Sequence, residues 1–164
     1  MNNRSSKRVE KLRQAFTQTT GLTVEVPLDI QVALWRKFMI IVSLSGIGAV
    51  TRTPFGVFLS FPQTRQMVQQ VMQEVFNVAQ AHGIALPPDI VNKTLIDLDG
   101  FPPSGTASMQ RDSMDGRPSE LEAQNGAVVR LGQALGVDTP LNTFIYHSLL
   151  PLELKARGQV HFAI

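Results

Sequence analysis

The stretch that decides the fold runs from Asp29 to Arg52 and reads DIQVALWRKFMIIVSLSGIGAVTR. Asp29 is a good helix N-cap, and Pro54 lies just beyond the far end, so the stretch predicts one long helix. The middle of this helix is apolar on every side rather than along one stripe. A helix of that kind packs in the centre of a domain, so we expect the rest of the chain to fold around it.

The residues that follow carry further helical patterns. Apolar spacing, N-terminal prolines and C-terminal glycines predict helices over about 62–81, 87–98, 108–114, 118–135 and 140–156. No internal repeat or low-complexity tract interrupts them. The predicted fold class of the body is therefore all-α.

The N-terminal residues differ from this body. Residues 5–19 predict a short polar helix that stops at Gly21, and the alternation over 22–26 predicts a strand. One strand cannot form a sheet, so we expect residues 1–28 to be the end of another domain and residues 29–164 to be the all-α domain. The first 13 residues also hold five basic side chains and one acidic one. A solvated helix face explains them, while an all-α regulator that binds nucleic acid is the alternative.

Composition narrows the class of protein. With 164 residues and 43% hydrophobic side chains, the chain can bury one sizeable core. The absence of cysteine excludes disulfides and thiolate chemistry, and the three isolated histidines predict no metal site. The most apolar run, residues 38–50, is shorter than the roughly 20 residues of a spanning helix, and the first residues lack the apolar centre of a signal peptide. We expect a cytoplasmic protein with no membrane partner.

The long helix also contains an incomplete glycine motif. Gly46-Ile-Gly48 matches the start of the G-x-G-x-x-G loop that binds dinucleotides, but Thr51 replaces the third glycine and Pro54 stops the helix that should follow. Small residues that allow a neighbouring helix to approach closely are the better interpretation. No residues that bind a cofactor can be named from the sequence.

Three polar side chains are candidates for a functional site, and each also has an ordinary explanation. Lys37, at the edge of the apolar helix centre, could extend its amine to solvent past apolar neighbours. Ser108 could cap its own helix, and Glu120 could sit in the first turn of a helix, where the dipole favours a carboxylate. The residues taken singly leave these alternatives open.

Taken together, the order and spacing of the motifs resemble one family. Over residues 29 to about 155 the chain is similar to the C-terminal domain of ketopantoate reductases. The matching motifs are Trp35-x-Lys37, Ala107-Ser108-Met109-x-x-Asp112, Gly116-Arg-Pro-Ser-Glu120-Leu-Glu122, Asn125-Gly126 and Gly136-Val-x-Thr139-Pro-x-Asn142.

The resemblance implies a fold and a reaction. The fold is the helical C-terminal domain of the 6-phosphogluconate dehydrogenase-like type, preceded here by a helix-strand remnant of an absent Rossmann domain. The reaction is the NADPH-dependent reduction of 2-dehydropantoate to pantoate in pantothenate biosynthesis, carried out by a homodimer. By this resemblance Lys37 is the general acid and Glu120 contributes to the catalytic site. Ser108 and Ser45 then bind the substrate.

Two departures from the family pattern leave the activity open. The family has an asparagine four residues after the lysine, where this chain has Ile41, so the substrate could be another 2-oxoacid. The glycine-rich NADP-binding domain has no counterpart in this sequence. We therefore expect the chain to be inactive unless a cofactor domain, in the same protein or as a separate chain, complements it. The alternative is a non-catalytic helical module that only self-associates.

Overall fold

The structure, a computed structural model, describes residues 6–162. Within that range the chain forms α-helices, one short 3-10 turn and no β-strand, which confirms the all-α prediction. The elements are α1 (Lys7–Thr17), α2 (Ile30–Thr51), α3 (Phe55–Ser60), α4 (Pro62–Ala81), α5 (Ile90–Asp97), η1 (Leu98–Gly100), α6 (Ser108–Met114), α7 (Asn125–Leu135) and α8 (Pro140–Ala156).

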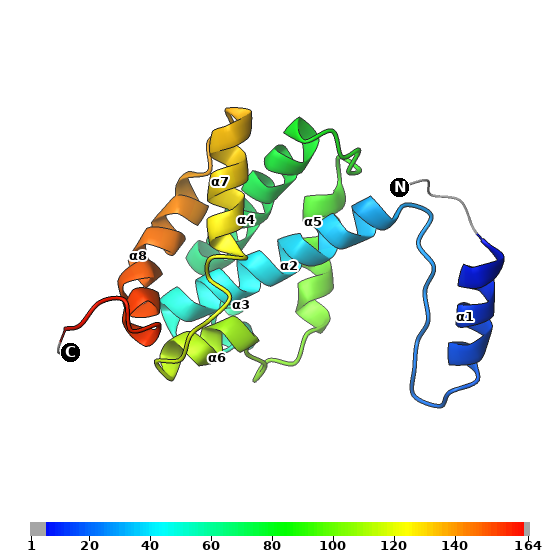
Figure 1. Cartoon of the computed structure of the whole chain (residues 1–164), viewed down its shortest axis with the longest axis horizontal. Helices are drawn as coiled ribbons and strands as arrows, with labels where there is room; N and C mark the ends of the chain where they lie inside the picture. Colours follow the sequence, from blue (N-terminus) through cyan, green and yellow to red (C-terminus); the bar gives the residue numbers. More distant parts are fainter. Residues whose placement is uncertain (1–5, 163–164) are drawn as a thin grey trace.

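The central element is α2, around which α4, α6 and α8 pack (Figure 1). Asp29 caps it, because its carboxylate accepts hydrogen bonds from the backbone N–H groups of Gln31 and Val32 at 2.8 and 3.3 Å. By length and composition α2 could span a membrane, with a mean hydropathy of 1.5 over 18 residues, and the expectation that no segment could do so is wrong. Half of that window is buried inside the protein, as in the core helix of a domain.

The two glycines of α2 are points of close approach to neighbouring helices. A Cβ atom on Gly48 would lie 2.4 Å from Gln110 Oε1, and one on Gly46 would lie 2.9 Å from Asn125 Nδ2. Both glycines are in the middle of a helix and not in a loop. The interpretation as small packing residues is confirmed.

A buried polar network joins three of the helices around α2. The Glu74 carboxylate of α4 accepts hydrogen bonds from the N–H groups of Leu141 and Asn142, at 2.8 and 2.9 Å, in the first turn of α8. It also accepts one from Asn142 Nδ2, at 2.6 Å, and Asn142 Oδ1 accepts one from Asn125 Nδ2 of α7, at 3.0 Å. Glu74 thus satisfies N–H groups that the start of a helix leaves without partners.

The turn after α2 contains a helix that the sequence patterns did not predict. Arg52 closes α2 with a φ of +57°, and Pro54 then starts α3. The rings of Phe55 and Phe58 are buried and meet edge to face, with their centroids 6.0 Å apart. Six residues are too few for a helical period to stand out in the sequence.

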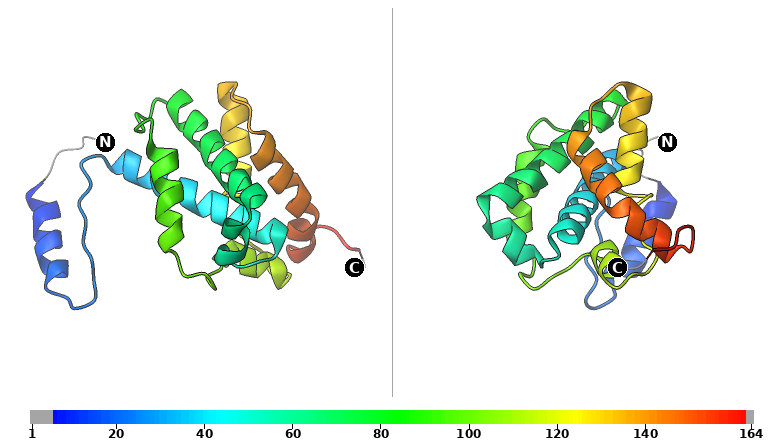
Figure 2. Two further views of the ribbon diagram at one scale, coloured as in Figure 1. Left: turned by 180° about the vertical axis from the view of Figure 1, so that it is seen from behind. Right: turned by 90° about the vertical axis from the view of Figure 1, so that its left-hand side faces the viewer.

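The N-terminal helix stands apart from the body in Figure 1 and in the left view of Figure 2. Ser6 caps α1, no residue of α1 is buried, and the predicted helix is confirmed over Lys7–Thr17. The strand predicted over 22–26 is wrong, because that segment has no regular secondary structure. A strand needs a neighbour to satisfy its backbone, and the part of the chain that the structure describes offers none.

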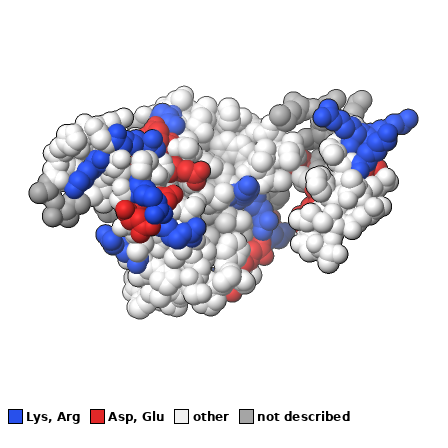
Figure 3. All heavy atoms as spheres, turned by 60° about the horizontal axis from the view of Figure 1, so that its bottom comes forward, with Lys and Arg blue, Asp and Glu red and all other residues white. Residues whose placement is uncertain are grey.

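Charge is distributed unevenly over the surface (Figure 3). Basic side chains gather over α1, where Glu10 is the one acidic residue and pairs with Arg13 at 2.6 Å. The Arg13 side chain, as the main hydrogen-bond partner, holds the pKa of Glu10 below its usual value. On the body, acidic and basic groups lie side by side as exposed ion pairs, such as Arg65 with Asp99.

Candidate functional site

The candidate site begins on one side of α2. Lys37, Ile41, Ser45 and Gly48 are spaced by four, four and three residues, so they lie along one side of the helix. Along this stripe the chain passes from the exposed Lys37 to the half-buried Ile41 and then to Ser45, which is 1% exposed. Gly48, at the buried end, faces Gln110 of α6. The stripe therefore leads from solvent to the packing surface between α2 and α6.

Lys37 is a free cation on this stripe. Within residues 6–162 its amine takes part in no ion pair, whereas its neighbour Arg36 pairs with Asp97. Its exposure fits the ordinary interpretation of a lysine at the edge of an apolar helix. The same exposure leaves its protons available to a bound molecule.

Ser108 is the first residue of α6 and is exposed. It does not cap that helix, because Ala107 occupies the N-cap position. Gln110 fixes this end of α6: its Oε1 accepts a hydrogen bond from Ala107 N at 3.3 Å, and its Nε2 donates one to Thr53 O at 2.9 Å. The Ser108 hydroxyl is left exposed beside a firmly held backbone.

Glu120 lies in a turn and not in a helix. The helix predicted over 118–135 starts only at Asn125, so the expectation that Glu120 occupies a first helical turn is wrong. Its carboxylate is exposed and accepts a hydrogen bond from Gln124 Nε2 at 2.9 Å. Its backbone carbonyl accepts one from Gln124 N, also at 2.9 Å.

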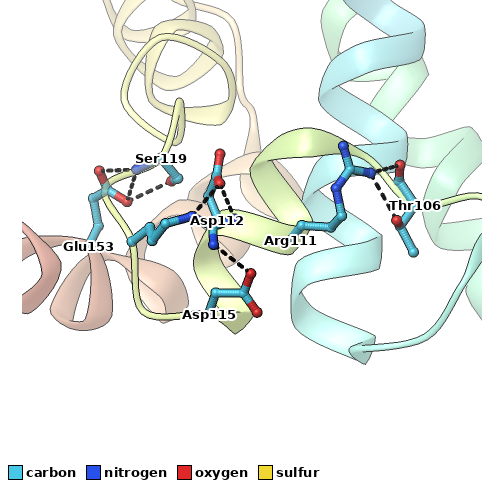
Figure 4. Close-up of polar contacts among 7 residues, drawn as sticks. Thr106, Arg111, Asp112, Asp115, Ser119 and Glu153 are labelled. Atoms are coloured by element: carbon cyan, nitrogen blue, oxygen red, sulfur yellow. Dashed lines mark hydrogen bonds and ion pairs between the residues drawn. The ribbon is translucent and has the colours of Figure 1, made fainter.

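The turn is held from α8, 34 residues further along the chain (Figure 4). The Glu153 carboxylate accepts hydrogen bonds from Ser119 N at 3.0 and 3.1 Å and from Ser119 Oγ at 2.6 Å. Arg157 completes the contact, since it donates to Glu153 at 2.7 Å and to Ser119 O at 2.7 Å. These contacts fix the start of the turn. The break before α7 lies at Gln124, whose φ of −102° and ψ of −97° depart from the helical region.

Arg117 forms ion pairs just before the turn. Its guanidinium contacts both Asp112 and Asp115 at 2.8 Å. The hydrogen bond to Asp112, followed by the charges of both carboxylates, raises the pKa of Arg117 above its usual value despite partial desolvation. Arg117 and Asp112, two residues of the motif, are thus engaged with each other.

The fold packs α6 against α2, but it does not join the candidate side chains. Within the described range, no hydrogen bond or ion pair links Lys37 to Glu120 or to Ser108. The same range contains no group of three acidic or histidine side chains able to hold a metal. The candidate residues remain predictions.

Sequence reasoning missed Glu153 and Arg157. The signal available was a glutamate within the apolar run of α8, four residues before an arginine. A charged residue in such a run is seldom buried without a partner. The sequence could suggest Arg157 as that partner, but not the contact with Ser119.

Comparison with known proteins identifies the group to which the chain belongs. The family described as "Ketopantoate reductase PanE/ApbA C terminal" matches residues 29–153, from the cap of α2 almost to the end of α8. The chain belongs to this family. The family assignment made from the motifs is confirmed.

Individual ketopantoate reductase relatives agree with this assignment. The 2-dehydropantoate 2-reductase of Pyrobaculum aerophilum is 33% identical over 127 residues, which are 77% of this chain and 45% of the relative. The solved 2-dehydropantoate 2-reductase of Methylococcus capsulatus is 30% identical, with a TM-score of 0.79 over 92% of this chain and 48% of that one.

A third protein shares the fold at lower identity. D-mandelate dehydrogenase, solved with NADH and anilino(oxo)acetate, is 22% identical, with a TM-score of 0.80 over 92% of this chain and 49% of that one. The chain thus spans about half the length of each of these relatives.

Proposed function

We propose that this chain is the substrate-binding half of an NADPH-dependent reductase of 2-dehydropantoate or a related 2-oxoacid, acting in pantothenate biosynthesis in the cytoplasm. The observation that carries the proposal is the position of Lys37. It is an exposed, unpaired cation within the described range, on the α2 stripe that leads to α6, in a chain whose residues 29–153 match the reductase family.

Lys37 would supply the proton in this reaction. Reduction of a keto group turns its carbonyl oxygen into an alkoxide, and an ammonium close to that oxygen both stabilises the developing charge and donates a proton. Glu120 would complete the catalytic site with its exposed carboxylate. The exposed hydroxyl of Ser108 would bind a polar group of the substrate, whereas Ser45, at 1% exposed, is closed off from solvent in this structure.

The cofactor would be held by a different domain. Reduced nicotinamide supplies a hydride, but the glycine motif of α2 does not fit its phosphates, because Gln110 and Asn125 already fill the space beside Gly48 and Gly46. We therefore assign residues 29–164 to the substrate and dimerisation domain and residues 1–28 to the end of a cofactor domain. That domain would be encoded upstream or by a separate chain.

The DNA sequence preceding the codon for Met1 tests this arrangement without any assay. It should encode a strand followed by G-x-G-x-x-G, in frame or in a neighbouring frame. An upstream region without that coding capacity, and without a neighbouring gene for such a domain, would contradict the two-part reductase.

Ile41 bears on which substrate is reduced. It replaces the asparagine that the family pattern leads us to expect one turn after Lys37, and its side chain cannot form hydrogen bonds. If 2-dehydropantoate is the substrate, Ile41→Asn should raise kcat/KM for it by about tenfold, the effect of one added polar contact. Competition between 2-oxoacids in a reconstituted assay measures this, and a fall in kcat/KM for 2-dehydropantoate would indicate a different 2-oxoacid.

A second function is favoured by the apolar side chains that remain exposed. These include Leu28, which is 94% exposed, Leu34, 52% exposed, and Phe144, 54% exposed. Apolar side chains bind another protein where they form one contiguous patch. The chain would then be a non-catalytic module that forms homodimers. A stable dimer with no response to NADPH supports the module, whereas NADPH binding by the assembled protein supports the reductase.

A further inference from the structure

Ser119, the residue before Glu120, has all of its polar groups engaged. Its backbone N–H and its hydroxyl both donate to Glu153, and its carbonyl accepts from Arg157 at 2.7 Å. Its hydroxyl oxygen also accepts a hydrogen bond from Leu121 N at 3.2 Å. A serine held at its N–H, carbonyl and side chain has little freedom to rotate its backbone.

The group that holds Ser119 is itself fixed. Glu153 is 6% exposed, and Arg157, one turn later on α8, donates to its carboxylate at 2.7 Å. Because hydrogen bonds to an ionised carboxylate are stronger than neutral ones, and because burial limits competition from water, this contact is a firm one. Figure 4 shows Glu153 and Ser119 facing each other across the gap between α8 and the turn.

The residue after Glu120 is fixed as well. Leu121 is 1% exposed and belongs to the hydrophobic core, and its carbonyl accepts a hydrogen bond from Gly126 N at 3.0 Å. Glu120 therefore lies between two immobilised neighbours, while its own carboxylate projects into solvent. The turn presents the Glu120 carboxylate, which accepts a hydrogen bond from Gln124 Nε2 at 2.9 Å, from a backbone that cannot easily move.

We infer that Glu153 and Arg157 are positioning residues that hold Glu120 in place for the reaction, an inference that rests on the proposed function. They act on Glu120 through Ser119 and do not themselves contact substrate. An enzyme needs a catalytic carboxylate held to within about 0.5 Å of its working position. In this chain the precision comes from α8 rather than from the turn itself.

Hydrogen exchange measured on the full chain tests the contact directly. Glu153→Gln should speed exchange of the 119–121 amides by about tenfold or more, because it removes a charged acceptor from Ser119 and Arg157. The matched control is Glu74→Gln, which alters the other buried glutamate that accepts backbone N–H groups and makes no hydrogen bond to Ser119, Glu120 or Leu121. Equal exchange in the wild-type chain and Glu153→Gln would overturn the contact.

Kinetics of the assembled enzyme separate positioning from simple stability. Glu153→Gln should lower kcat by about tenfold, as expected when a catalytic group is misplaced, and should have almost no further effect in a Glu120→Gln background. Additive losses in the double variant would show that Glu153 acts independently of Glu120 and would overturn the inference. Glu74→Gln should remain additive with Glu120→Gln.

Two substitutions of Ser119 test whether its hydroxyl transmits the effect of Glu153 to Glu120. Ser119→Thr keeps the hydroxyl that donates to Glu153 and should retain turnover, whereas Ser119→Ala should reproduce the loss seen in Glu153→Gln. Wild-type turnover in Ser119→Ala would contradict the inference. If Glu120→Gln has no effect on turnover, the inference fails because there is nothing to position, and the proposed function fails only if Lys37→Ala is also without effect.

Discussion

At the scale of single residues, two buried glutamates hold backbone segments that lie far away in the sequence. Glu74 satisfies the first turn of α8, and Glu153 of α8 holds Ser119 in the turn that carries Glu120. Each carboxylate is almost fully buried, and each accepts several N–H or O–H groups. Such groups are costly to bury without partners, so both residues determine local backbone structure.

The pKa of Tyr146 should reveal its contact with Glu122. Its hydroxyl donates a hydrogen bond to Glu122 Oε2 at 2.6 Å, and this bond, followed by burial, raises the pKa of Tyr146 above its usual value. The stabilisation is therefore present below about pH 10 and is lost as the pH rises through the folded-state pKa. Tyrosinate absorbance measures this value without ambiguity, because the chain has a single tyrosine.

Glu122→Gln supplies the comparison for that titration. Removing the negative charge should bring the Tyr146 midpoint back toward about 10, the value expected in the urea-unfolded chain. A midpoint that is the same in the wild-type and variant chains would show that the contact with Glu122 does not persist in solution.

Gly48→Ala should destabilise the domain by up to about 2 kcal/mol. The new methyl group would overlap Gln110, at a cost of about 1–3 kcal/mol, while alanine regains about 1 kcal/mol of helix propensity. Urea unfolding followed by the fluorescence of Trp35, the only tryptophan, measures the change. In a Gln110→Ala background, Gly48→Ala should leave the free energy of unfolding unchanged or raise it. If Gly48→Ala destabilises that background as much as the wild-type chain, overlap with Gln110 is not the cause of the destabilisation.

At the scale of the elements, long-range contacts decide where several helices begin. The start of α8 depends on Glu74 of α4, and the turn before α7 is tied to α8 through Ser119. α6 depends on Gln110, whose amide reaches the Thr53 carbonyl beyond the end of α2. The helices of the body are therefore tied to each other at their ends as well as through the core.

Glu74→Ala should lower the free energy of unfolding by roughly 2–3 kcal/mol, because it leaves two N–H groups of α8 and the Asn142 amide without their charged acceptor. Glu74→Gln should cost less, since one acceptor oxygen remains. Denaturant unfolding measures both. The control is Glu10→Gln in the exposed helix α1, which should leave the free energy of unfolding of the body unchanged. If Glu74→Ala changes that free energy as little as Glu10→Gln does, the buried network does not stabilise the fold.

The sequence predicted most helices because their signals are local. Asp29 before an apolar run predicted α2, the residues 108–114 predicted α6, and Pro140 in a first turn predicted α8. The start of α7 could not be predicted, since the break lies at Gln124, whose φ of −102° and ψ of −97° are not helical although glutamine is no helix-stop signal.

The candidate site was predictable only in part. Lys37 and Ser45 share a side of one helix, which spacing alone predicts. The turn around Glu120 and its attachment to α8 are tertiary features that periodicity cannot reveal. The strand over 22–26 failed for a related reason, because its alternation does not specify a partner.

At the scale of the whole molecule, the body is a helical domain with α2 as its core, and α1 stands apart from it (Figure 1). The chain spans about half the length of the reductases it resembles. The substrate-side residues proposed here lie on α2, α6 and the turn before α7. A cofactor domain would have to present nicotinamide next to Lys37.

The most direct test is turnover of the chain when it is complemented with a glycine-rich cofactor domain. With NADPH and 2-dehydropantoate, Lys37→Ala should lower kcat by about 100-fold or more while changing KM little, since the loss of a general acid affects the chemical step. Lys93→Ala, which removes an exposed lysine paired with Asp89, should match the wild-type chain. Unchanged turnover in Lys37→Ala would contradict the account.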